Sequence, residues 1–323
     1  MSQSKKKGSG NRAVGKASGS EAAAVGSKGR WTAFVVAGAV IVLVLAMLGA
    51  GYYREYVAPF HRTIITVDDV NLDMGYFLKR TRLAGVDPML MLEVLTHEQF
   101  VKLGAPRYGI EARPEDVNRE LRRVARGESE TISESEFKEW YRQQLNETGL
   151  SDAEYKEIVA TSLLAASLHE YLAERIPTVG EQVYLHAIVF ATYEDAQSAR
   201  ARWEAGEELA DLARELSVDE QSRERVGDLG WLPRGILGSK LDTVVFSLAP
   251  GEVSEPLRME ENEYCFFMVS GKDAARQIDE NHVQILKDGA LQDWLSEEVG
   301  FHEVKYDFDS EIYAWMNWQL AKE

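Results

Sequence analysis

Cysteine is nearly absent from this sequence. The 323 residues contain one cysteine, Cys265, which excludes an intrachain disulfide and any metal site built from several cysteines. The six histidines are scattered, and none belongs to a His-Glu-x-x-His pair. A phosphate-binding loop and a dinucleotide-binding glycine fingerprint are also missing. We therefore expect no metal and no cofactor, and a fold that packing alone stabilises.

Positive charge is scarce over most of the chain. The formal net charge is -17, although residues 1–30 hold seven lysines and arginines against one acid, Glu21. The remaining body is therefore more acidic than the total indicates. Nucleic-acid binding needs a basic face that displaces phosphate counterions, so we expect no nucleic-acid partner. The hydrophobic content of 45% is typical of globular domains, and the length suffices for two of them.

Long uncharged runs are absent except for one. Residues 31–53 carry no charge and are long enough to span a hydrocarbon core of about 30 Å. Aromatic residues stand at both ends of the run, as is typical of a membrane interface. The basic residues 1–30 predict a disordered cytoplasmic tail, with the body outside the membrane. A cleaved signal peptide is the alternative, but Leu48-Gly-Ala50 is a poor cleavage site.

Residues 62–182 are predicted to be mostly helical. Ile64–Val67 has the composition of a short strand leading into a helix over 69–83. Pro114 is expected at the first turn of another helix, which Gly127 ends. Two capping boxes mark further helix starts, at Ser133 with Glu136 and at Ser151 with Glu154. After residue 273 the chain returns to helix, with a last helix predicted from Ser310.

The segment 183–273 contains the most specific pattern in the chain. An alternating strand, 183–190, is followed by a helical pair and by a polar loop that starts at Ser217. The stretch Gly227-Asp-Leu-Gly-Trp231 comes next. A further stretch, 246–256, leads to a closing apolar strand, 264–269. In that order these pieces resemble the parvulin family of peptidyl-prolyl cis-trans isomerases. The flanking helical regions are similar to those of SurA-like and PrsA-like foldases.

The resemblance implies an α+β fold, with a small antiparallel sheet surrounded by helices. It also implies an apolar pocket that grips a proline ring, and by motif position this pocket falls on Leu229, Leu237 and Leu241. Plain core leucines are the alternative interpretation, above all for Leu241. Asn262, just before the closing strand, is expected to contact the substrate backbone.

Three positions stand where the family has catalytic residues. His186 matches a histidine of the first strand and should share a face with Ile188, because strand side chains alternate. Asp219 falls at a position that holds Cys or Asp in the family. A one-residue shift to Glu220, or a simple solvated acid, is the alternative. Cys265 replaces the family's second histidine, and a thiol cannot form the two-nitrogen bridge to His186.

The resemblance implies an extracytoplasmic prolyl isomerase that assists the folding of secreted or membrane proteins, held in the cell membrane by a single pass. The alternative is a non-catalytic holdase chaperone with a degenerate parvulin domain. Either would bind unfolded or proline-containing polypeptides. The expected domains are a tail (1–30), a transmembrane helix (31–53), a helical chaperone domain (54–182), a parvulin-like domain (183–273) and C-terminal helices docking on the chaperone domain (274–323).

Overall fold

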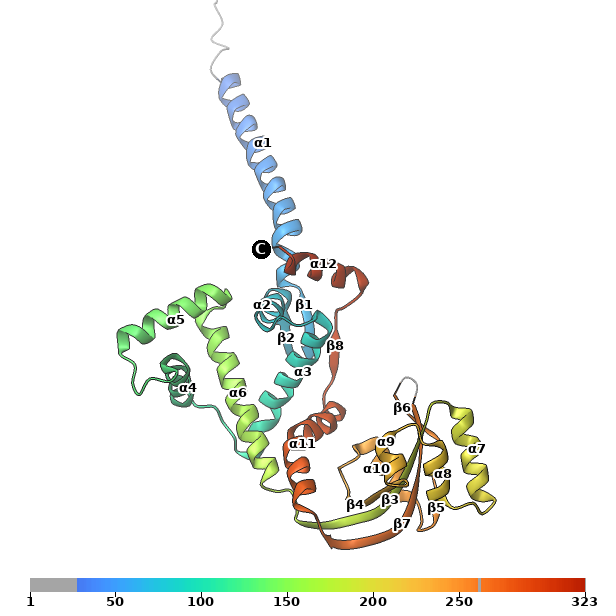
Figure 1. Ribbon diagram of the computed structural model, residues 1–323. Helices are drawn as coiled ribbons and strands as arrows, with labels where there is room; N and C mark the ends of the chain where they lie inside the picture. Colours follow the sequence, from blue (N-terminus) through green and yellow to red (C-terminus); the bar gives the residue numbers. More distant parts are fainter. Residues whose placement is uncertain (1–27, 261–262, 323) are drawn as a thin grey trace, which may run out of the picture. The chain divides into compact units, whose positions relative to one another are not determined.

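The computed structural model describes residues 28–260 and 263–322, with the backbone alone for residues 28–37, 221 and 260. The chain divides into two compact units, Met1–Arg62 and Thr63–Glu323. In the first unit, helix α1 (Lys28–Tyr52) continues into η1 (Tyr53–Val57) and η2 (Ala58–His61) (Figure 1). Most of the tail predicted for residues 1–30 lies outside the described residues.

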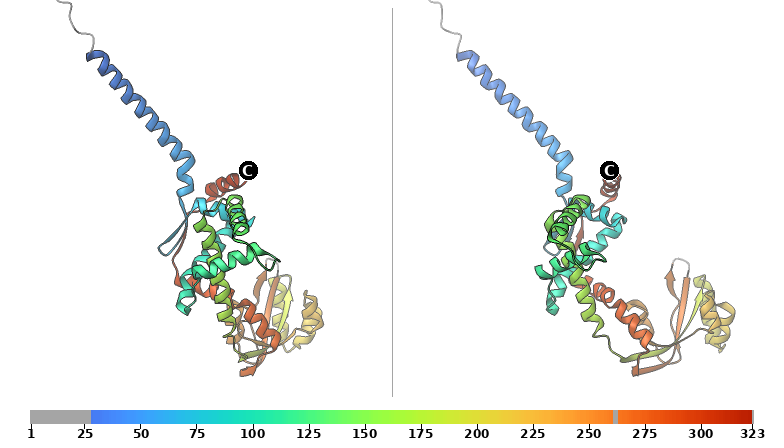
Figure 2. Two further views of the ribbon diagram at one scale, coloured as in Figure 1. Left: turned by 90° about the vertical axis from the view of Figure 1, so that its left-hand side faces the viewer. Right: turned by 60° about the vertical axis from the view of Figure 1, so that its left-hand side comes forward.

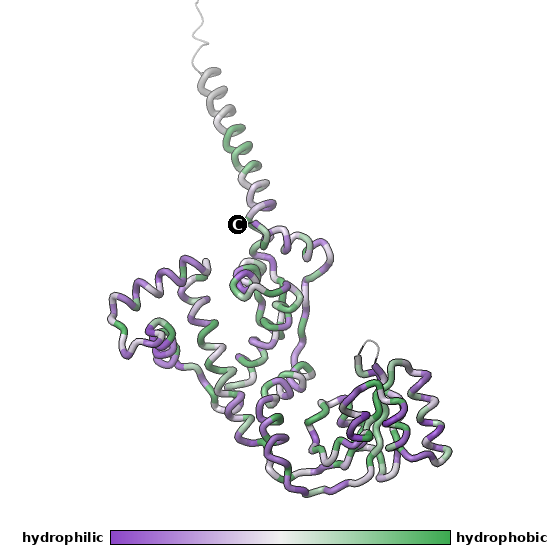
Figure 3. The backbone as a smooth tube through the Cα atoms, viewed as in Figure 1, coloured by the Kyte–Doolittle hydropathy of each residue, from purple (hydrophilic) through white to green (hydrophobic). Residues whose placement is uncertain are grey.

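One segment among the described residues, Gly38–His61, is long and apolar enough to cross a membrane. Its large apolar side chains are exposed, as Leu45 at 61% illustrates. The hydrophobic colouring in the middle of α1 lies within this segment (Figure 3). An exposed apolar helix of this length has the composition that a bilayer accommodates.

The second unit begins with a hairpin and continues through helices. The hairpin pairs β1 (Thr63–Val67) with β2 (Val70–Asp73), and β8 (Val304–Tyr306) pairs with the other edge of β1. Helices follow the hairpin in the order α2 (Met74–Ala84), α3 (Pro88–Gly104), η3 (Ala105–Tyr108), α4 (Pro114–Arg126), α5 (Glu134–Thr148) and α6 (Asp152–Ala173). After the larger sheet come α11 (Glu280–Glu298), η4 (Val299–Phe301), β8 and α12 (Ser310–Leu320).

The helix predicted over 69–83 is wrong at its start. Asp68 adopts a left-handed φ of 51°, which turns the chain back so that β2 pairs with β1. The Asp73 side chain then accepts the N–H of Tyr76 and begins α2, since a carboxylate there satisfies a free helix N–H. Strand β8 has no counterpart among the predicted elements, because its three residues form a strand only through pairing with β1.

Local signals located the other helix starts correctly. Pro114 is the first residue of α4. Ser133 and Ser151 each accept a backbone N–H, and the glutamate three residues on accepts the N–H of the serine. Both predicted capping boxes are therefore confirmed.

The larger sheet is antiparallel and has the strand order β4-β3-β7-β5, with β6 also paired to β7. Its central pair is β3 (Val179–Phe190) and β7 (Glu263–Gln277). The other strands are β4 (Asp228–Pro233), β5 (Glu252–Val253) and β6 (Leu257–Glu260). Both central strands extend beyond their predicted limits, through bulges at Gly180/Gln182 and Tyr184/Leu185 that interrupt the alternation.

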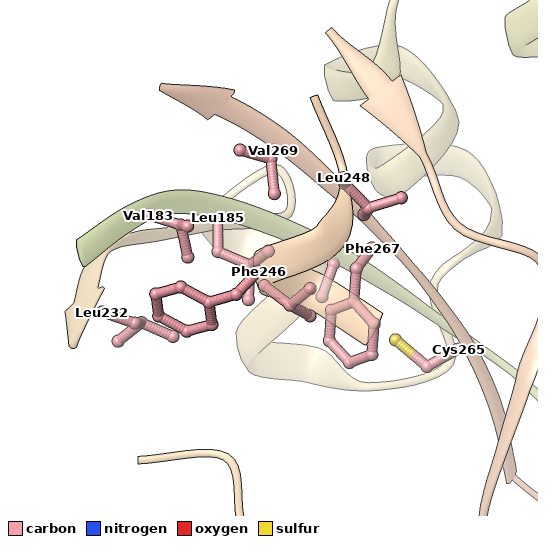
Figure 4. Packing of buried hydrophobic residues seen from close by; sticks show 10 residues of the cluster. Val183, Leu185, Leu232, Phe246, Leu248, Cys265, Phe267 and Val269 are labelled. Carbon is pink, nitrogen blue, oxygen red and sulfur yellow. The ribbon is translucent and has the colours of Figure 1, made fainter. Parts of the chain in front are cut away.

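Each face of this sheet covers its own hydrophobic core. Helices α7 (Tyr193–Glu204) and α8 (Leu209–Leu216) cover one face (Figure 2), where Ile188, Phe190 and Phe266 are buried. On the other face, α10 (Ser239–Ser247) covers a core that we call the cleft-side core. Its members, most of them labelled in Figure 4, are Val183, Leu185, Ala187, Leu232, Val245, Phe246, Leu248, Cys265, Phe267 and Val269.

Candidate functional site

An open cleft of about 660 Å³ lies at the edge of the cleft-side core. It is lined from the loop before α10, from α10 itself and from β6. The lining residues are Leu237, Gly238, Ser239, Lys240, Leu241, Val244, Leu257, Arg258 and Met259. Five of these nine side chains are apolar, and no acid is among them, so the cleft suits an apolar ring with polar backbone at its rim.

Two of the three predicted pocket leucines meet in this cleft. Leu237 and Leu241 line it, and both pack partly buried against the cleft-side core. Leu229 packs against the same core but is not a lining residue of the cleft. Leu257 and Met259 were not predicted, although their two-residue spacing in front of the closing strand is typical of a strand face. Asn262 lies outside the described residues.

The loop between α8 and β4 is tied to β3 by side-chain and backbone hydrogen bonds. Asp219 precedes the short helix α9 (Glu220–Glu224), and its carboxylate accepts the N–H of Ser222 at 2.6 Å. The Ser222 hydroxyl donates to the Ala187 carbonyl at 2.8 Å, and the Ala187 N–H donates to Gly227 at 2.8 Å. A Cβ on Gly227 would lie 3.0 Å from the Ala187 oxygen, so this close approach requires glycine.

His186 lies on the face of the sheet that the cleft-side core does not occupy. Its Nε2 is 3.0 Å from the Ser270 hydroxyl, and its ring lies 5.4 Å from that of Tyr184. The Tyr184 hydroxyl in turn donates to Asp228 at 2.8 Å. Partial burial lowers the pKa of His186, and the Asp228 charge opposes this effect. The strand alternation places His186 on the same face as Ile188, as predicted.

Cys265 lies on the opposite face, inside the cleft-side core, with 2% of its surface exposed. Its thiol donates weakly to the Phe266 carbonyl at 3.4 Å. Burial raises the pKa of Cys265 to about 12, and the Asp219 charge acts in the same direction. Asp219 is therefore close enough to Cys265 to influence it electrostatically, whereas His186 is separated from it by the sheet.

The cleft therefore offers an apolar surface with two basic side chains, Lys240 and Arg258, among its lining residues. Ala187, which follows His186, faces the cleft-side core and lies opposite Phe267, whereas Cys265 lies opposite Val189. Among the lining residues no histidine, cysteine or carboxylate is present. In the part of the chain that the structure describes, no group of three His, Cys, Asp or Glu side chains could hold a metal ion.

Comparison with known families places the central segment. The family model of the PPIC-type PPIase domain matches residues 190–267, a range that includes Asp219, the three pocket leucines and Cys265 but begins after His186. The foldase protein PrsA of Oceanobacillus iheyensis is 26% identical over 171 residues, which are 50% of this chain and 55% of that protein. The periplasmic chaperone PpiD of Haemophilus ducreyi is 29% identical over 140 residues, 42% of this chain and 22% of that protein.

The matched segments cover only part of this chain and only part of each of these curated relatives. PrsA of Clostridium tetani is 24% identical over 128 residues, and the match covers 40% of this chain and 35% of that protein. The chain thus matches between about a fifth and about a half of the length of these curated relatives. Among solved structures, PrsA from Bacillus anthracis aligns at 18% identity with a TM-score of 0.37, covering 72% of this chain and 96% of that one. Residues 190–267 are a parvulin domain of the PPIC type, and the chain is a relative of the PrsA and PpiD foldases.

Proposed function

We propose that this protein is a membrane-tethered prolyl isomerase that assists the folding of polypeptides outside the cytoplasm. The parvulin domain and its foldase relatives support an isomerase that assists folding. The proposed division keeps the helical chaperone domain at 54–182, the parvulin-like domain at 183–273 and the C-terminal helices at 274–323. Clients would be unfolded or proline-containing chains, because the cleft accepts an apolar ring and an extended backbone.

The observation that carries this proposal is the convergence of Leu237 and Leu241 in one open cleft. Isomerisation of an X-Pro bond makes and breaks no covalent bond. It requires rotation about a partly double C–N bond against an amide barrier of about 18–20 kcal/mol. An apolar pocket can hold the prolyl ring while the preceding carbonyl rotates. A surface of this kind binds the twisted amide better than the planar one. Such a surface needs no imidazole.

The cleft supplies catalysis through desolvation. Taking the amide out of water favours its twisted form, because that form has lost the resonance that gives the planar amide its large dipole and strong hydration. Cys265 contributes an apolar side chain to the cleft-side core, since its thiol stays neutral with a pKa of about 12. Asp219 caps α9 and so orders the loop that is tied to β3 beside this core.

The location outside the cytoplasm is proposed from residues 1–61. The apolar segment Gly38–His61 is long enough to span a bilayer, and the lysines and arginines before it favour a cytoplasmic N-terminus. The exposed rings of Tyr52 and Tyr56 stack at 5.1 Å at the end of this segment, where aromatic residues favour the membrane interface. The relatives named PrsA and PpiD support the same placement.

The test is prolyl isomerisation of Ala-Leu-Pro-type peptides by the full chain in detergent or nanodiscs. Leu241→Lys places a charge in the cleft and removes an apolar contact worth about 1.5–3 kcal/mol, so kcat/KM should fall at least about tenfold. Val179→Lys is the matched control, because Val179 is exposed at the start of β3 and does not line the cleft. A parent chain without activity would remove the isomerase proposal.

A holdase is the second candidate, and the separation of His186 from Cys265 favours it. If the cleft binds extended chains without catalysing rotation, the protein should suppress aggregation of a client that contains no proline. Leu241→Lys would then weaken suppression, whereas the isomerase assay would show no turnover above the uncatalysed rate. Activity on the peptide together with no effect on the proline-free client would exclude the holdase.

A further inference from the structure

The loop that carries Leu237 into the cleft has little backbone bonding of its own. This loop, residues 234–238, joins β4 to α10. Gly235 and Gly238 have positive φ angles of 99° and 76°. Its two turn hydrogen bonds, from Ile236 to Pro233 and from Gly238 to Gly235, are both long at 3.4 Å. A glycine-containing loop with two weak bonds does not fix a side chain by itself.

A carboxylate on α10 provides the missing connection. Asp242 directly follows Leu241 and is buried, with 5% of its surface exposed. Its Oδ2 accepts the N–H of Gly235, and the N–H of Leu237 also faces the carboxylate closely enough to lower its pKa. The Asp242 N–H donates to the Gly238 carbonyl at 3.0 Å. One residue therefore connects the helix that carries Leu241 to the loop that carries Leu237.

The electrostatic surroundings show that this burial is costly. Burial raises the pKa of Asp242, the two loop N–H groups and Arg234 lower it, and Asp293 on α11 raises it. The second oxygen, Oδ1, is buried without a hydrogen-bond partner among the described residues. Burying an unsatisfied carboxylate oxygen destabilises the fold, so its contact with the loop must provide a compensating benefit.

We propose that Asp242 is a positioning residue for proline binding, which acts by holding the Gly235 N–H and so fixing Leu237 opposite Leu241. The inference rests on the proposed function, since it assigns this role within the same cleft. It also implies that peptide binding requires the charged form of Asp242. A carboxylate holds an N–H more strongly than a neutral acid or an amide does.

The sign of the pH dependence follows from that difference. Above its folded pKa, Asp242 is charged and holds the loop, so peptide affinity is high. As the pH falls through this raised pKa, the acid becomes neutral and affinity decreases. Asp242→Asn resembles the neutral acid at every pH. It should therefore bind more weakly at pH 7 and lose this part of the pH profile.

The experiment measures the Kd of the full chain for a fluorescent Ala-Leu-Pro-type peptide between pH 4 and pH 8. Loss of one charge-assisted hydrogen bond should weaken binding about tenfold for Asp242→Asn at pH 7. Lys272→Met is the matched control. The Lys272 ammonium donates to the Phe246 carbonyl near the other end of α10 and does not touch the loop. This control should lower stability while leaving the Kd and its pH profile unchanged.

The outcomes separate the two proposals. A parent that binds the peptide, with an Asp242→Asn variant of equal Kd and equal pH profile, overturns the positioning role and leaves the proposed function intact. A parent that binds no proline peptide overturns both. If Asp242→Asn does not fold, the parent chain tests the inference. The amide resonance of Gly235 and the peptide Kd should both change with pH at one shared midpoint. Two different midpoints would overturn the inference.

Discussion

His186 and Cys265 lie on opposite faces of the sheet that β3 and β7 form. From Leu185 to Phe190 the two strands pair in regular register, in which His186 is opposite Met268 and Cys265 is opposite Val189. Directly opposed residues share a face, and His186 and Val189 are an odd number of positions apart, so their side chains point to opposite sides. The family resemblance implied a histidine pair at positions 186 and 265, with Cys265 unable to form the bridge. In this register a side chain at position 265 faces away from His186 whatever its type.

His186→Ala should leave isomerase activity and peptide binding within about twofold of the parent. The variant loses the hydrogen bond to Ser270 and the ring contact with Tyr184, both on the face away from the cleft. The free energy of unfolding should fall by about 1 kcal/mol. Urea unfolding and the peptide assay measure the two effects.

The double variant His186→Ala/Cys265→Ala tests whether the two side chains interact. Because the two side chains share no partner, their effects on stability should add within about 0.5 kcal/mol. A coupling energy above about 1 kcal/mol would show that the two side chains interact and would contradict the observed register. A His186→Ala variant that is inactive beside an active parent would contradict only the expected dispensability of His186.

The thiol of Cys265 should make stability depend on pH in alkaline solution. Its pKa is raised from 9.0 to about 12 in the folded chain, so the unfolded chain releases this proton at lower pH than the folded chain does. Stability from this group is complete below about pH 9. It is lost as the pH rises toward 12, by up to about 1.4 kcal/mol per pH unit.

Comparison with Cys265→Ala isolates this contribution from the other groups that titrate at alkaline pH. The parent should lose stability relative to the variant between pH 9 and pH 11 in urea titrations. Equal slopes for the two proteins would mean that the folded thiol ionises normally and is not buried.

Gly104→Ala should destabilise the second unit. Gly104 ends α3, and a Cβ at this position would overlap the ring of Trp294 on α11. The Trp294 indole N–H is held by the Tyr108 hydroxyl at 3.1 Å, so the ring cannot move freely. Overpacking of this kind costs about 1–3 kcal/mol, which thermal or urea unfolding would detect.

Gly289→Ala is the matched substitution with the opposite expected sign. Gly289 lies inside α11, and a Cβ at this position would be 3.9 Å from its nearest neighbour, the Asp293 carboxylate. Alanine is favoured over glycine in a helix by about 1 kcal/mol. Equal effects at the two positions would contradict the packing of α3 against α11.

Ser151→Ala should weaken the start of α6 by about 1 kcal/mol. The Ser151 hydroxyl accepts the Glu154 N–H at 3.2 Å, and the Glu154 carboxylate accepts the Ser151 N–H at 2.6 Å. Glu154 also accepts from Lys79 on α2 at 3.0 Å, so the cap is connected to a neighbouring helix. Amide exchange should increase in the first turn of α6.

Ser133→Ala is the matching substitution at the start of α5, a helix with no fully buried residue. Loss of its cap should increase amide exchange along the whole of α5, because little tertiary packing holds this helix. Exchange confined to its first turn would show that packing, and not the cap, maintains the helix.

Features that depend on neighbouring residues were predictable from the amino-acid sequence. The capping boxes at Ser133 and Ser151 and the helix start at Pro114 could be located, because a few adjacent side chains satisfy the free backbone groups of a helix. The order of motif pieces over 183–273 likewise predicted the parvulin domain that the family match confirms. The same order pointed to Leu237 and Leu241, which both line the cleft, and their role in holding a proline ring stays a prediction.

Which side chains meet depends instead on the folded chain. Alternation assigned His186 to one face of its strand, but the face of Cys265 relative to His186 depends on the register between β3 and β7. Register and bulges are set by packing between residues about 80 positions apart in this chain, and a local pattern does not contain them. For the same reason the pairing of β8 with β1 depends on bringing distant segments together. The contact of Asp242 with the loop of Leu237 spans only seven residues, but it depends on how α10 packs against that loop, which a local pattern does not contain.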